Sequence, residues 1–396
     1  MKIGLLGVSF LSGNLGCQAL SYSCLEILNI IAKEKQTTFD VFVMLSFPTK
    51  KWLKSRMNKE VYKKPSLPKG RYSNLNVDIL FYRQKENKIL FFGNVKKLNY
   101  VIDLTAGDSF TDIYGKERFF EGTSMKNYVI SKNIPLILGS QTIGPFRDKN
   151  IQSIASETIS KCYAVYARDK KSYDYTMEIS EVEPRLTTDV AFFLPYSNKT
   201  INKTKIRVGV NVSGLLWNGG YTKDNQFGLK FDYQKYCRTI LSELSKNDDY
   251  EVHLIIHVYS ENMSVLDNDL IPMGILKKEF PNVIVSPVFQ TPMEAKSYIS
   301  TMDIFTGARM HSTIAAFSAA VPVIPFSYSR KFEGLFGSLD YTYLVKGCSF
   351  SLDYAVECTL AWIEKRYELK NNMTNGMRII NEQGEFLIQD LGKILL

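Results

Sequence analysis

The sequence predicts an α/β fold made of two doubly wound domains, each a parallel sheet covered by helices. Short apolar runs alternate with longer amphipathic ones, which is the pattern of consecutive strand–helix–strand units. The chain has 396 residues, more than one domain of ordinary size contains. The alternation restarts after residues 197–205, a polar stretch with the composition of a linker. We therefore expect one domain over residues 1–196 and a second over residues 205–396.

Each domain begins with a buried strand and continues with alternating elements. In the first domain we expect strands at residues 2–8, 39–46, 77–81, 100–104, 135–139 and 163–167, with helices at 17–33, 116–132 and 148–161. In the second domain we expect strands at residues 207–212, 252–257, 283–286, 304–306 and 321–326. The last helix of the chain is expected to pack back on the first domain.

Composition excludes several classes of protein. With 45% hydrophobic and 22% charged residues, the chain is neither disordered, nor collagen-like, nor a coiled coil. Its six cysteines include no CxxC pair, which favours reduced thiols and a cytoplasmic protein. The first apolar run, residues 3–8, is too short for a signal peptide. The apolar stretch 310–329 contains Pro322 and Pro325, so a helix followed by a strand explains it better than a membrane span.

The chain is basic, with 49 Lys and Arg against 40 Asp and Glu and a net charge of +9. Such a balance favours an acidic partner, which means nucleic acid, anionic lipid or a phosphorylated substrate. Residues 50–71 interrupt the alternation and contain nine Lys or Arg and one acid, Glu60. This segment is interpreted as an exposed insertion, and it is either a solvated loop or a contact for an anionic partner.

Ligands of open parallel sheets bind beyond the carboxyl ends of the strands, where helix N-termini offer backbone N–H groups. The turn after the first strand, residues 9–18, contains two glycines and the amide of Asn14, but it lacks the GxGxxG fingerprint of a dinucleotide site. Residues 139–146, Gly-Ser-Gln-Thr-Ile-Gly-Pro-Phe, place Gln141 at the tip of another strand. We expect Asn14 and Gln141 to bind substrate, although turn chemistry alone also accounts for both segments.

The most distinctive turn lies at residues 303–317, where a buried strand, a glycine turn at Gly307 and an apolar helix follow one another. Arg309 and His311 fall in the first turn of that helix, where positive charge is unfavourable. An anionic ligand makes the arrangement favourable, because Arg pairs with carboxylate or phosphate. His311, with an ordinary pKa of about 6.5, is suited to be a general acid. Alternatively, Arg309 forms a salt bridge to the neighbouring domain and His311 packs in the core.

Four further side chains are candidates for the site. Lys331 follows the strand that ends at residue 326 and is expected to join the anion pocket, or else is a surface lysine. Arg168 follows the strand that ends at residue 167 and is expected to bind substrate. Asp189 is a candidate base, or else a turn or cap residue. His257 is a candidate catalytic residue at the end of its strand.

No metal site is predicted. The three histidines have no His or Cys partner at ligand spacing, and the sequence contains no HExxH motif. Asp267 and Asp269 form an isolated DxD near the start of a helix, and we interpret them as helix caps.

Several of these segments together form a recognisable set. In order they are Asn14-Leu-Gly-Cys-Gln-Ala-Leu, Gly139-Ser-Gln-Thr-Ile-Gly-Pro-Phe, Ala167-Arg-Asp-Lys-Lys-Ser, Thr188-Asp-Val-Ala-Phe and Gly307-Ala-Arg-Met-His, followed by Pro322-Val-Ile-Pro-Phe-Ser-Tyr-Ser-Arg-Lys. The set resembles the polysaccharide pyruvyltransferase family over residues 3–340. The Arg-x-His turn with its downstream Tyr-x-x-Lys is the most specific part of the resemblance.

The resemblance implies a GT-B-like architecture, in which two Rossmann-like α/β domains face each other across a cleft. It implies transfer of the enolpyruvyl unit of phosphoenolpyruvate to sugar hydroxyls, giving a pyruvate ketal and phosphate. The acceptor is then a glycan or a lipid-linked glycan precursor of an exopolysaccharide on the N-terminal domain, and phosphoenolpyruvate, on the C-terminal domain, is the donor substrate with no further cofactor. Arg309 and His311 match the family's phosphoenolpyruvate-binding and acid positions.

This chemistry agrees with the residue types. Arg309, with Lys331 or Arg168, is expected to balance the negative charge of phosphoenolpyruvate, a small trianion. His311 is the expected proton donor to the methylene carbon of phosphoenolpyruvate. Asp189 or His257 is expected to assist the sugar hydroxyl.

Three other interpretations remain open. A GT-B glycosyltransferase that uses a nucleotide sugar shares the fold and the anion site. Nucleic-acid binding is suggested by residues 50–71, but no nucleic-acid motif is present, so we expect no such partner. The same segment is also suited to contact an anionic membrane or a lipid diphosphate at the inner membrane face, which is compatible with the transferase.

Overall fold

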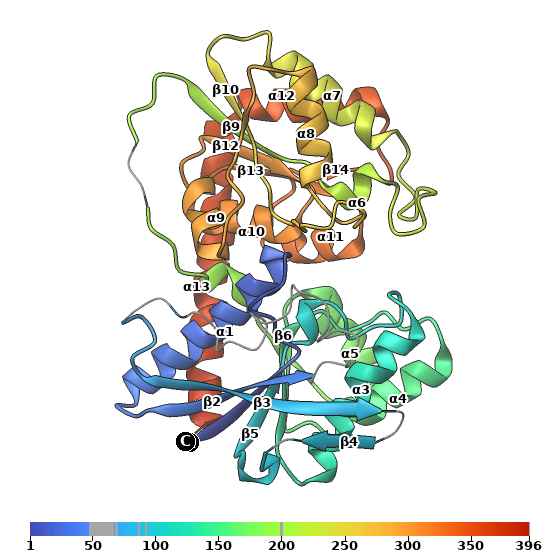
Figure 1. The fold of residues 1–396 in the computed structure, drawn as a ribbon, viewed down its shortest axis with the longest axis vertical. Coiled ribbons are helices and arrows are strands. Elements are labelled where there is room, and N and C mark those ends of the chain that lie inside the picture. Colours follow the sequence, from blue (N-terminus) through green and yellow to red (C-terminus); the bar gives the residue numbers. More distant parts are fainter. Residues whose placement is uncertain (47–66, 68–69, 86–87, 92, 199–200, 396) are drawn as a thin grey trace. The chain divides into compact units, whose positions relative to one another are not determined.

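The computed structural model describes residues 1–46, 67, 70–85, 88–91, 93–198 and 201–395. The chain forms two compact units (Figure 1). Unit 1 consists of Met1–Leu11, Leu20–Val190 and Glu382–Leu396, and unit 2 consists of Ser12–Ala19 and Ala191–Asn381. Each unit is built on its own sheet with helices packed against it, so the predicted α/β class with doubly wound sheets is confirmed.

The sheet of unit 1 has eight strands in the order β4-β3-β2-β1-β5-β6-β7-β8. The strands are β1 (Lys2–Leu6), β2 (Phe39–Ser46), β3 (Leu75–Lys85), β4 (Lys88–Phe91), β5 (Tyr100–Asp103), β6 (Leu136–Gln141), β7 (Ala164–Ala167) and β8 (Arg185–Leu186). All neighbouring pairs are parallel except β3 and β4. The sequence prediction missed β4, a short antiparallel edge strand, and ended β6 at residue 139, two residues early.

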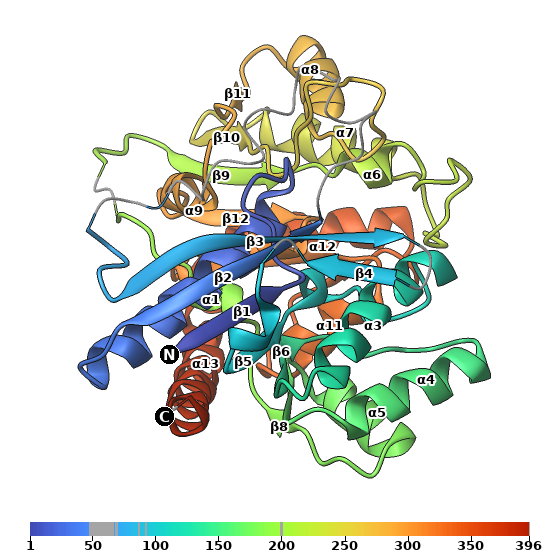
Figure 2. The same cartoon turned by 60° about the horizontal axis from the view of Figure 1, so that its bottom comes forward.

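Helices cover this sheet and begin where the local sequence provides a start. The helices of unit 1 are α1 (Leu15–Glu34), α3 (Lys116–Ser131), α4 (Lys149–Ser160), α5 (Lys170–Ile179) and the end of α13 (Arg366–Ile394). The carboxylates of Asp148 and Asp169 accept N–H groups of the first turns of α4 and α5, as N-caps do. Figure 2 shows α1 beside the end of α13, where Gly392 packs against Ile31.

Helix α1 has the length and apolar character of a membrane-spanning segment. However, 78% of its most apolar part is buried inside the protein, as is typical of a core helix. The stretch 310–329 forms a helix and a strand, as predicted from its prolines.

The sheet of unit 2 has six parallel strands in the order β11-β10-β9-β12-β13-β14. The strands are β9 (Ile206–Asn211), β10 (Tyr250–Leu254), β11 (Ile284–Val285), β12 (Ile304–Gly307), β13 (Val323–Ser327) and β14 (Val345–Lys346). The helices are α6 (Gly214–Trp217), α7 (Tyr233–Leu244), α8 (Leu270–Glu279), α9 (Pro292–Ile299), α10 (Met310–Ser318), α11 (Arg330–Gly337), α12 (Leu352–Glu364) and most of α13. The strand order reverses at β9, which lies between β10 and β12. Ligands of doubly wound sheets bind at such a switch point.

The two units do not follow a single division of the sequence between residues 196 and 205. Unit 2 already begins at Ala191, because Lys296 and Ser297 of α9 hold the connecting segment. Lys296 Nζ donates to the carbonyls of Phe192 and Leu194, and Ser297 Oγ accepts the N–H of Ser197. The prediction also missed that Ser12–Ala19 belongs to unit 2.

The basic segment at residues 50–71 lies almost entirely outside the described residues. At its end, Arg71 forms an ion pair of 3.1 Å with Glu26 of α1.

Candidate functional site

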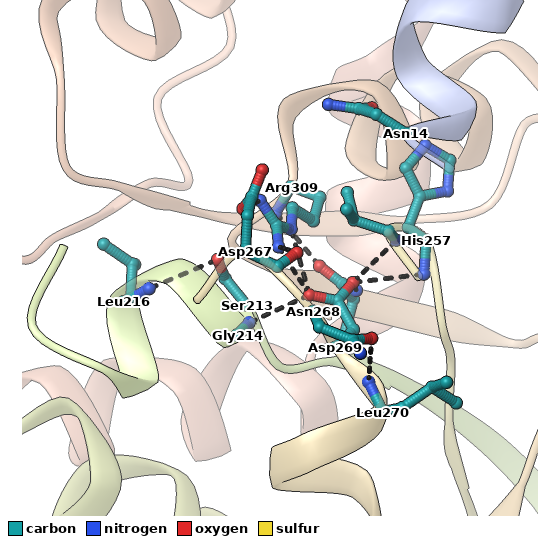
Figure 3. A network of polar contacts seen from close by, with 12 residues as sticks. Asn14, Ser213, Gly214, Leu216, His257, Asp267, Asn268, Asp269, Leu270 and Arg309 are labelled. Carbon is teal, nitrogen blue, oxygen red and sulfur yellow. Dashed lines mark hydrogen bonds and ion pairs between the residues drawn. The ribbon is translucent and has the colours of Figure 1, made fainter. Parts of the chain in front are cut away.

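The candidate site of unit 2 lies at the switch point of its sheet (Figure 3). Asn211 ends β9, His257 follows β10, and Arg309 follows β12 at the N-terminal end of α10. Because these strands are neighbours and parallel, their carboxyl ends bring together side chains that are far apart in the sequence. Gly307, the last residue of β12, packs against the Asn211 side chain, where a Cβ would lie 2.9 Å from that of Asn211.

Arg309 is buried and paired within its own unit. Its Nη1 donates to Asp267 Oδ1, and its Nη2 donates to Asp269 Oδ1 at 2.6 Å and to the Asp267 carbonyl at 2.9 Å. Burial alone lowers the pKa of Arg309, but the charges of Asp269 and Asp267 outweigh it and raise the pKa above its ordinary value. Two carboxylates therefore already compensate the positive charge at this helix start, a role that the sequence analysis gave to an anionic ligand. The substrate-binding role of Arg309 stays a prediction. A salt bridge to the neighbouring domain is not what holds the guanidinium.

Asp269 is not the helix cap that the sequence suggested. It stands at the N-cap position of α8, but its side chain makes no capping hydrogen bond and is fully buried. Its carboxylate instead accepts hydrogen bonds from groups around the switch point, including Arg309 and the backbone of His257. Sequence reasoning missed this role, and the Asp-x-Asp spacing followed by a distant Arg was the only signal of it.

His257 lies three residues beyond the end of β10 and is 3% exposed. In the described part of the chain, neither of its ring nitrogens has a hydrogen-bond partner. Burial, together with the positive charges of His311 and Arg309, lowers the pKa of His257 to about 3. The ring is therefore neutral at physiological pH and holds one donor and one acceptor for a ligand. A buried polar group without a partner is costly, so His257 stays a candidate for a ligand contact.

His311 is half-buried in the first turn of α10, next to the segment 12–19. The His311 ring lies against Gly16 so closely that a Cβ at residue 16 would come within 2.5 Å of His311 Nδ1. Glycine at this position therefore leaves the space that the imidazole occupies.

The segment 12–19 is held to the loop after β10 by main-chain contacts. The N–H of Leu15 donates to the His257 carbonyl at 3.1 Å, and the N–H of Tyr259 donates to the Gly13 carbonyl at 2.9 Å. Asn14 Oδ1 accepts the N–H of Gly16 at 2.9 Å, so it caps α1. The NH₂ group of Asn14 takes no part in this bond, and its role in substrate binding stays a prediction.

Lys331 lies in the first turn of α11, after β13, the neighbour of β12. It is half-buried, and its Nζ is 5.8 Å from the centre of the Tyr328 ring. Lys331 therefore lies at the same edge of the sheet as Arg309, as the sequence predicted.

The other predicted residues lie in unit 1, at or beyond the carboxyl ends of β6, β7 and β8. Arg168 and Asp189 are both buried, and Arg168 Nη1 pairs with Asp189 Oδ2 at 2.7 Å. Gln141 is the last residue of β6 and is fully buried, and its Nε2 donates to the carbonyl of Asp103 at 2.9 Å. Its Oε1 has no hydrogen-bond partner among the described residues.

A buried ion pair beside Gln141 was not predicted. Lys126 of α3 contacts Asp103 at the end of β5 at 3.2 Å, and its Nζ donates to Thr105 Oγ1 at 2.7 Å. Both charged side chains are 1% exposed. The Lys126 position has only its place in an amphipathic helix as a sequence signal, so its burial required the tertiary structure.

Among the residues that the structure describes, no group of three or more His, Cys, Asp or Glu side chains is placed to hold a metal ion. The cysteines described there are free thiols.

Comparisons with known proteins agree on fold and family. The chain is similar to the UDP-GlcNAc 2-epimerase from Neisseria meningitidis bound to UDP-GlcNAc, with a TM-score of 0.57, 12% identity and coverage of 99% of this chain and 100% of that one. It is also similar to Anabaena HepE in complex with UDP-glucose, with a TM-score of 0.53, 10% identity and coverage of 100% and 99%. At such identities the likeness shows the fold, which is that of GT-B glycosyltransferases and epimerases. No curated protein sequence matches the chain.

The sequence itself matches one family. The model of the family described as polysaccharide pyruvyl transferase matches residues 14–330, most of the chain and both units. The match begins at Asn14 and ends one residue before Lys331, so it includes the Arg309 and His311 turn. This chain belongs to the polysaccharide pyruvyl transferase family, a family of transferases of polysaccharide biosynthesis.

Proposed function

We propose that the chain transfers the enolpyruvyl unit of phosphoenolpyruvate to sugar hydroxyls of a glycan or lipid-linked glycan precursor and closes it to a pyruvate ketal. The family supports a pyruvyl transferase. The observation that carries the proposal is the group at the switch point of unit 2, where half-buried His311 lies near buried His257 at the start of α10. A half-buried imidazole beside a buried one whose ring nitrogens have no partner among the described residues is suited to deliver a proton to a bound substrate.

In this proposal the reaction has two additions at C2 of phosphoenolpyruvate. His311 gives a proton to the methylene carbon, and the first sugar hydroxyl adds to C2 and loses its proton. Phosphate then leaves with the electrons of its C–O bond, and the second hydroxyl adds to C2 and loses its proton. The products are a ketal that carries a methyl and a carboxylate group, and inorganic phosphate.

In this proposal, Arg309 alone does not bind the negative charge of phosphoenolpyruvate. Arg309 is already paired with Asp267 and Asp269, so it brings little net positive charge to a trianion. The N-terminus of α10, Lys331 and the neutral donor of His257 are the groups we propose to bind the donor in addition. Arg309 then offers directed hydrogen bonds rather than excess charge.

We assign the acceptor to unit 1, where Gln141 ends β6, Arg168 follows β7 and Asp189 follows the edge strand β8. Asp189 remains a proposed base for the sugar hydroxyl. His257, with its low pKa, is a weaker base at neutral pH and is better suited to hold a hydrogen bond. The proposal needs no cofactor beyond the donor substrate, and it places the enzyme in the cytoplasm or at the inner membrane face.

The proposal is tested by incubating the purified protein with phosphoenolpyruvate and candidate glycans. We expect release of phosphate and a glycan mass increase that corresponds to one pyruvate ketal. A thermal-shift comparison with nucleotide sugars forms the second arm. Stabilisation by UDP-glucose or UDP-GlcNAc, with none by phosphoenolpyruvate, contradicts the proposal and favours a nucleotide-sugar transferase.

A further inference from the structure

Asp269 is a fully buried carboxylate whose two oxygens serve two different parts of the site (Figure 3). Oδ1 accepts Nη2 of Arg309 at 2.6 Å, Nε of Arg309 at 3.1 Å and the N–H of Gly214 at 2.8 Å. This half of the carboxylate fixes the plane of the Arg309 guanidinium, since two nitrogens of one planar group meet one oxygen.

The second oxygen serves the loop that carries His257. Oδ2 accepts the N–H groups of His257 at 3.1 Å and of Val258 at 2.9 Å. Asn211 Nδ2 approaches the same oxygen at 3.4 Å. The backbone of His257, and hence the position of its ring, is therefore fixed by the same side chain that fixes Arg309.

We infer that Asp269 is a positioning residue that couples the Arg309 side chain to the His257 loop. The inference rests on the proposed function, because it assigns to this coupling the joint orientation of the donor-binding groups. Every group around the carboxylate donates a hydrogen bond, so both oxygens must be acceptors. An amide at this position has one acceptor oxygen and one NH₂ group. It can therefore accept from only one of the two arms, which are the Arg309 side chain and the His257 loop, and its NH₂ group is repelled by the donors of the other.

Asp267 provides a natural comparison, because it serves only one arm. Its carboxylate pairs with Nη1 of Arg309 and its carbonyl accepts Nη2, and its side chain is 18% exposed. None of the hydrogen bonds of the described residues joins Asp267 to His257. A change at Asp267 therefore affects Arg309 and leaves the His257 loop in place.

The test compares three Asp→Asn variants of the full chain. Asp269→Asn is expected to raise KM for phosphoenolpyruvate and to lower kcat, with kcat/KM falling about 10²-fold, since small misplacements of site groups have effects of this size. Asp267→Asn is expected to change KM and to leave kcat within about twofold of the wild type. Asp303→Asn is the matched control. Asp303 also accepts a backbone N–H and pairs with a lysine, Lys203, but it lies at the opposite edge of the sheet. KM and kcat of Asp303→Asn are therefore expected to equal those of the wild type.

Hydrogen exchange of the amides at 257 and 258 is measured in the same variants. Asp269→Asn is expected to accelerate this exchange, because the amide oxygen stays with the cationic Arg309 and the NH₂ group then faces the N–H groups of His257 and Val258. Asp267→Asn and Asp303→Asn are expected to leave the exchange unchanged. Unchanged exchange, or the same kinetic pattern in Asp269→Asn and Asp303→Asn, overturns the inference. If Asp269→Asn does not fold, Asp269→Glu, which keeps both acceptors and moves them by one methylene, must show the KM and kcat losses instead.

Different results contradict the proposed function and the coupling through Asp269. If the wild type neither binds nor turns over phosphoenolpyruvate, the proposed function is wrong. Coupling of the two arms is then judged by exchange alone, and wild-type exchange in Asp269→Asn refutes it.

Discussion

At the scale of single residues, the site contains contacts so close that even one added methyl group would displace a side chain. His311 stands in the first turn of α10, Gly16 leaves room for its ring, and His257 lies buried nearby. His311 and Gly16 each give a separate prediction about turnover.

His311→Ala is expected to reduce kcat by about 10²–10⁴-fold, because general acid catalysis is typically worth that much. KM for phosphoenolpyruvate is expected to change far less, since the proposed role of His311 is proton delivery. The measurement is phosphate release under saturating donor and acceptor. Wild-type turnover in a variant that binds phosphoenolpyruvate normally shows that another group is the acid.

Gly16→Ala is expected to lower kcat by about 10²-fold without unfolding the protein. The new methyl group would lie 2.5 Å from Nδ1 and 2.9 Å from Cγ of His311, so the imidazole has to move. Gly274→Ala in α8 is the control, because a Cβ there meets nothing within 4 Å and alanine favours a helix by about 1 kcal/mol. If both variants keep wild-type kcat, the position of the His311 ring is not critical for turnover.

At the scale of elements, α9 attaches the connecting segment to unit 2 through a buried lysine. Lys296 donates to the carbonyls of Phe192 and Leu194, and its Nζ lies 4.9 Å from the centre of the Tyr196 ring. Burial lowers the pKa of Lys296 to about 7 from its ordinary 10.5. The boundary of unit 2 therefore depends on a side chain that titrates near neutral pH.

The pH dependence of stability follows from this shift. Between about pH 7 and pH 10.5 the unfolded chain holds a proton on Lys296 that the folded protein has released. The contribution of Lys296 to the free energy of unfolding is therefore full above pH 10.5 and is lost as the pH falls to about 7. At about 1.4 kcal/mol per pKa unit, the change amounts to a few kcal/mol.

Urea unfolding at about pH 7, 8.5 and 10 measures this effect. We expect the wild type to gain stability with pH relative to Lys296→Met, which has no titrating group at this position. Lys235→Met, on an exposed position of α7, is the control and is expected to follow the wild type. A constant difference between the wild type and Lys296→Met contradicts the lowered pKa.

At the scale of the whole molecule, the basic character is concentrated in one segment. Residues 50–71 carry nine basic residues and one acidic residue, a net charge of +8, which leaves +1 of the total +9 for the rest of the chain. A bound anion in the site of unit 2 therefore does not account for the excess charge. We propose that an anionic surface meets residues 50–71, which would account for the excess charge.

A vesicle experiment tests this assignment. We expect the full chain to sediment with vesicles that contain anionic lipid at about 50 mM salt, and to be released at about 500 mM, because salt screens exposed charges. A variant with Lys50, Lys51, Lys54, Lys63 and Lys64 changed to Gln is expected to lose this binding and to keep turnover of a soluble acceptor. Equal binding by the variant means that the contact lies elsewhere.

The sequence by itself determined the order of the elements, the doubly wound class and the family. Local apolar periodicity indicates strands and helices without knowledge of their neighbours, and motifs such as Gly307-Ala-Arg-Met-His are contiguous. The sequence analysis missed the edge strands β4 and β8, because each is short and begins with a charged residue, so neither forms an apolar run that stands out from the neighbouring loops.

Only the tertiary structure decided which charges meet. Arg309 and Asp269 are 40 residues apart in the sequence, and the parallel arrangement of β9, β10 and β12 brings them together. Asn14 and Gly16 lie more than 170 residues before the rest of unit 2 in the sequence, yet the main-chain hydrogen bonds of Gly13 and Leu15 place their segment against the loop after β10. The physical reason is that a hydrogen bond or ion pair depends on distance in space and leaves no local pattern in the chain. For that reason the sequence named Arg309 and His311, while the structure revealed the carboxylate that holds Arg309 and the glycine that admits His311.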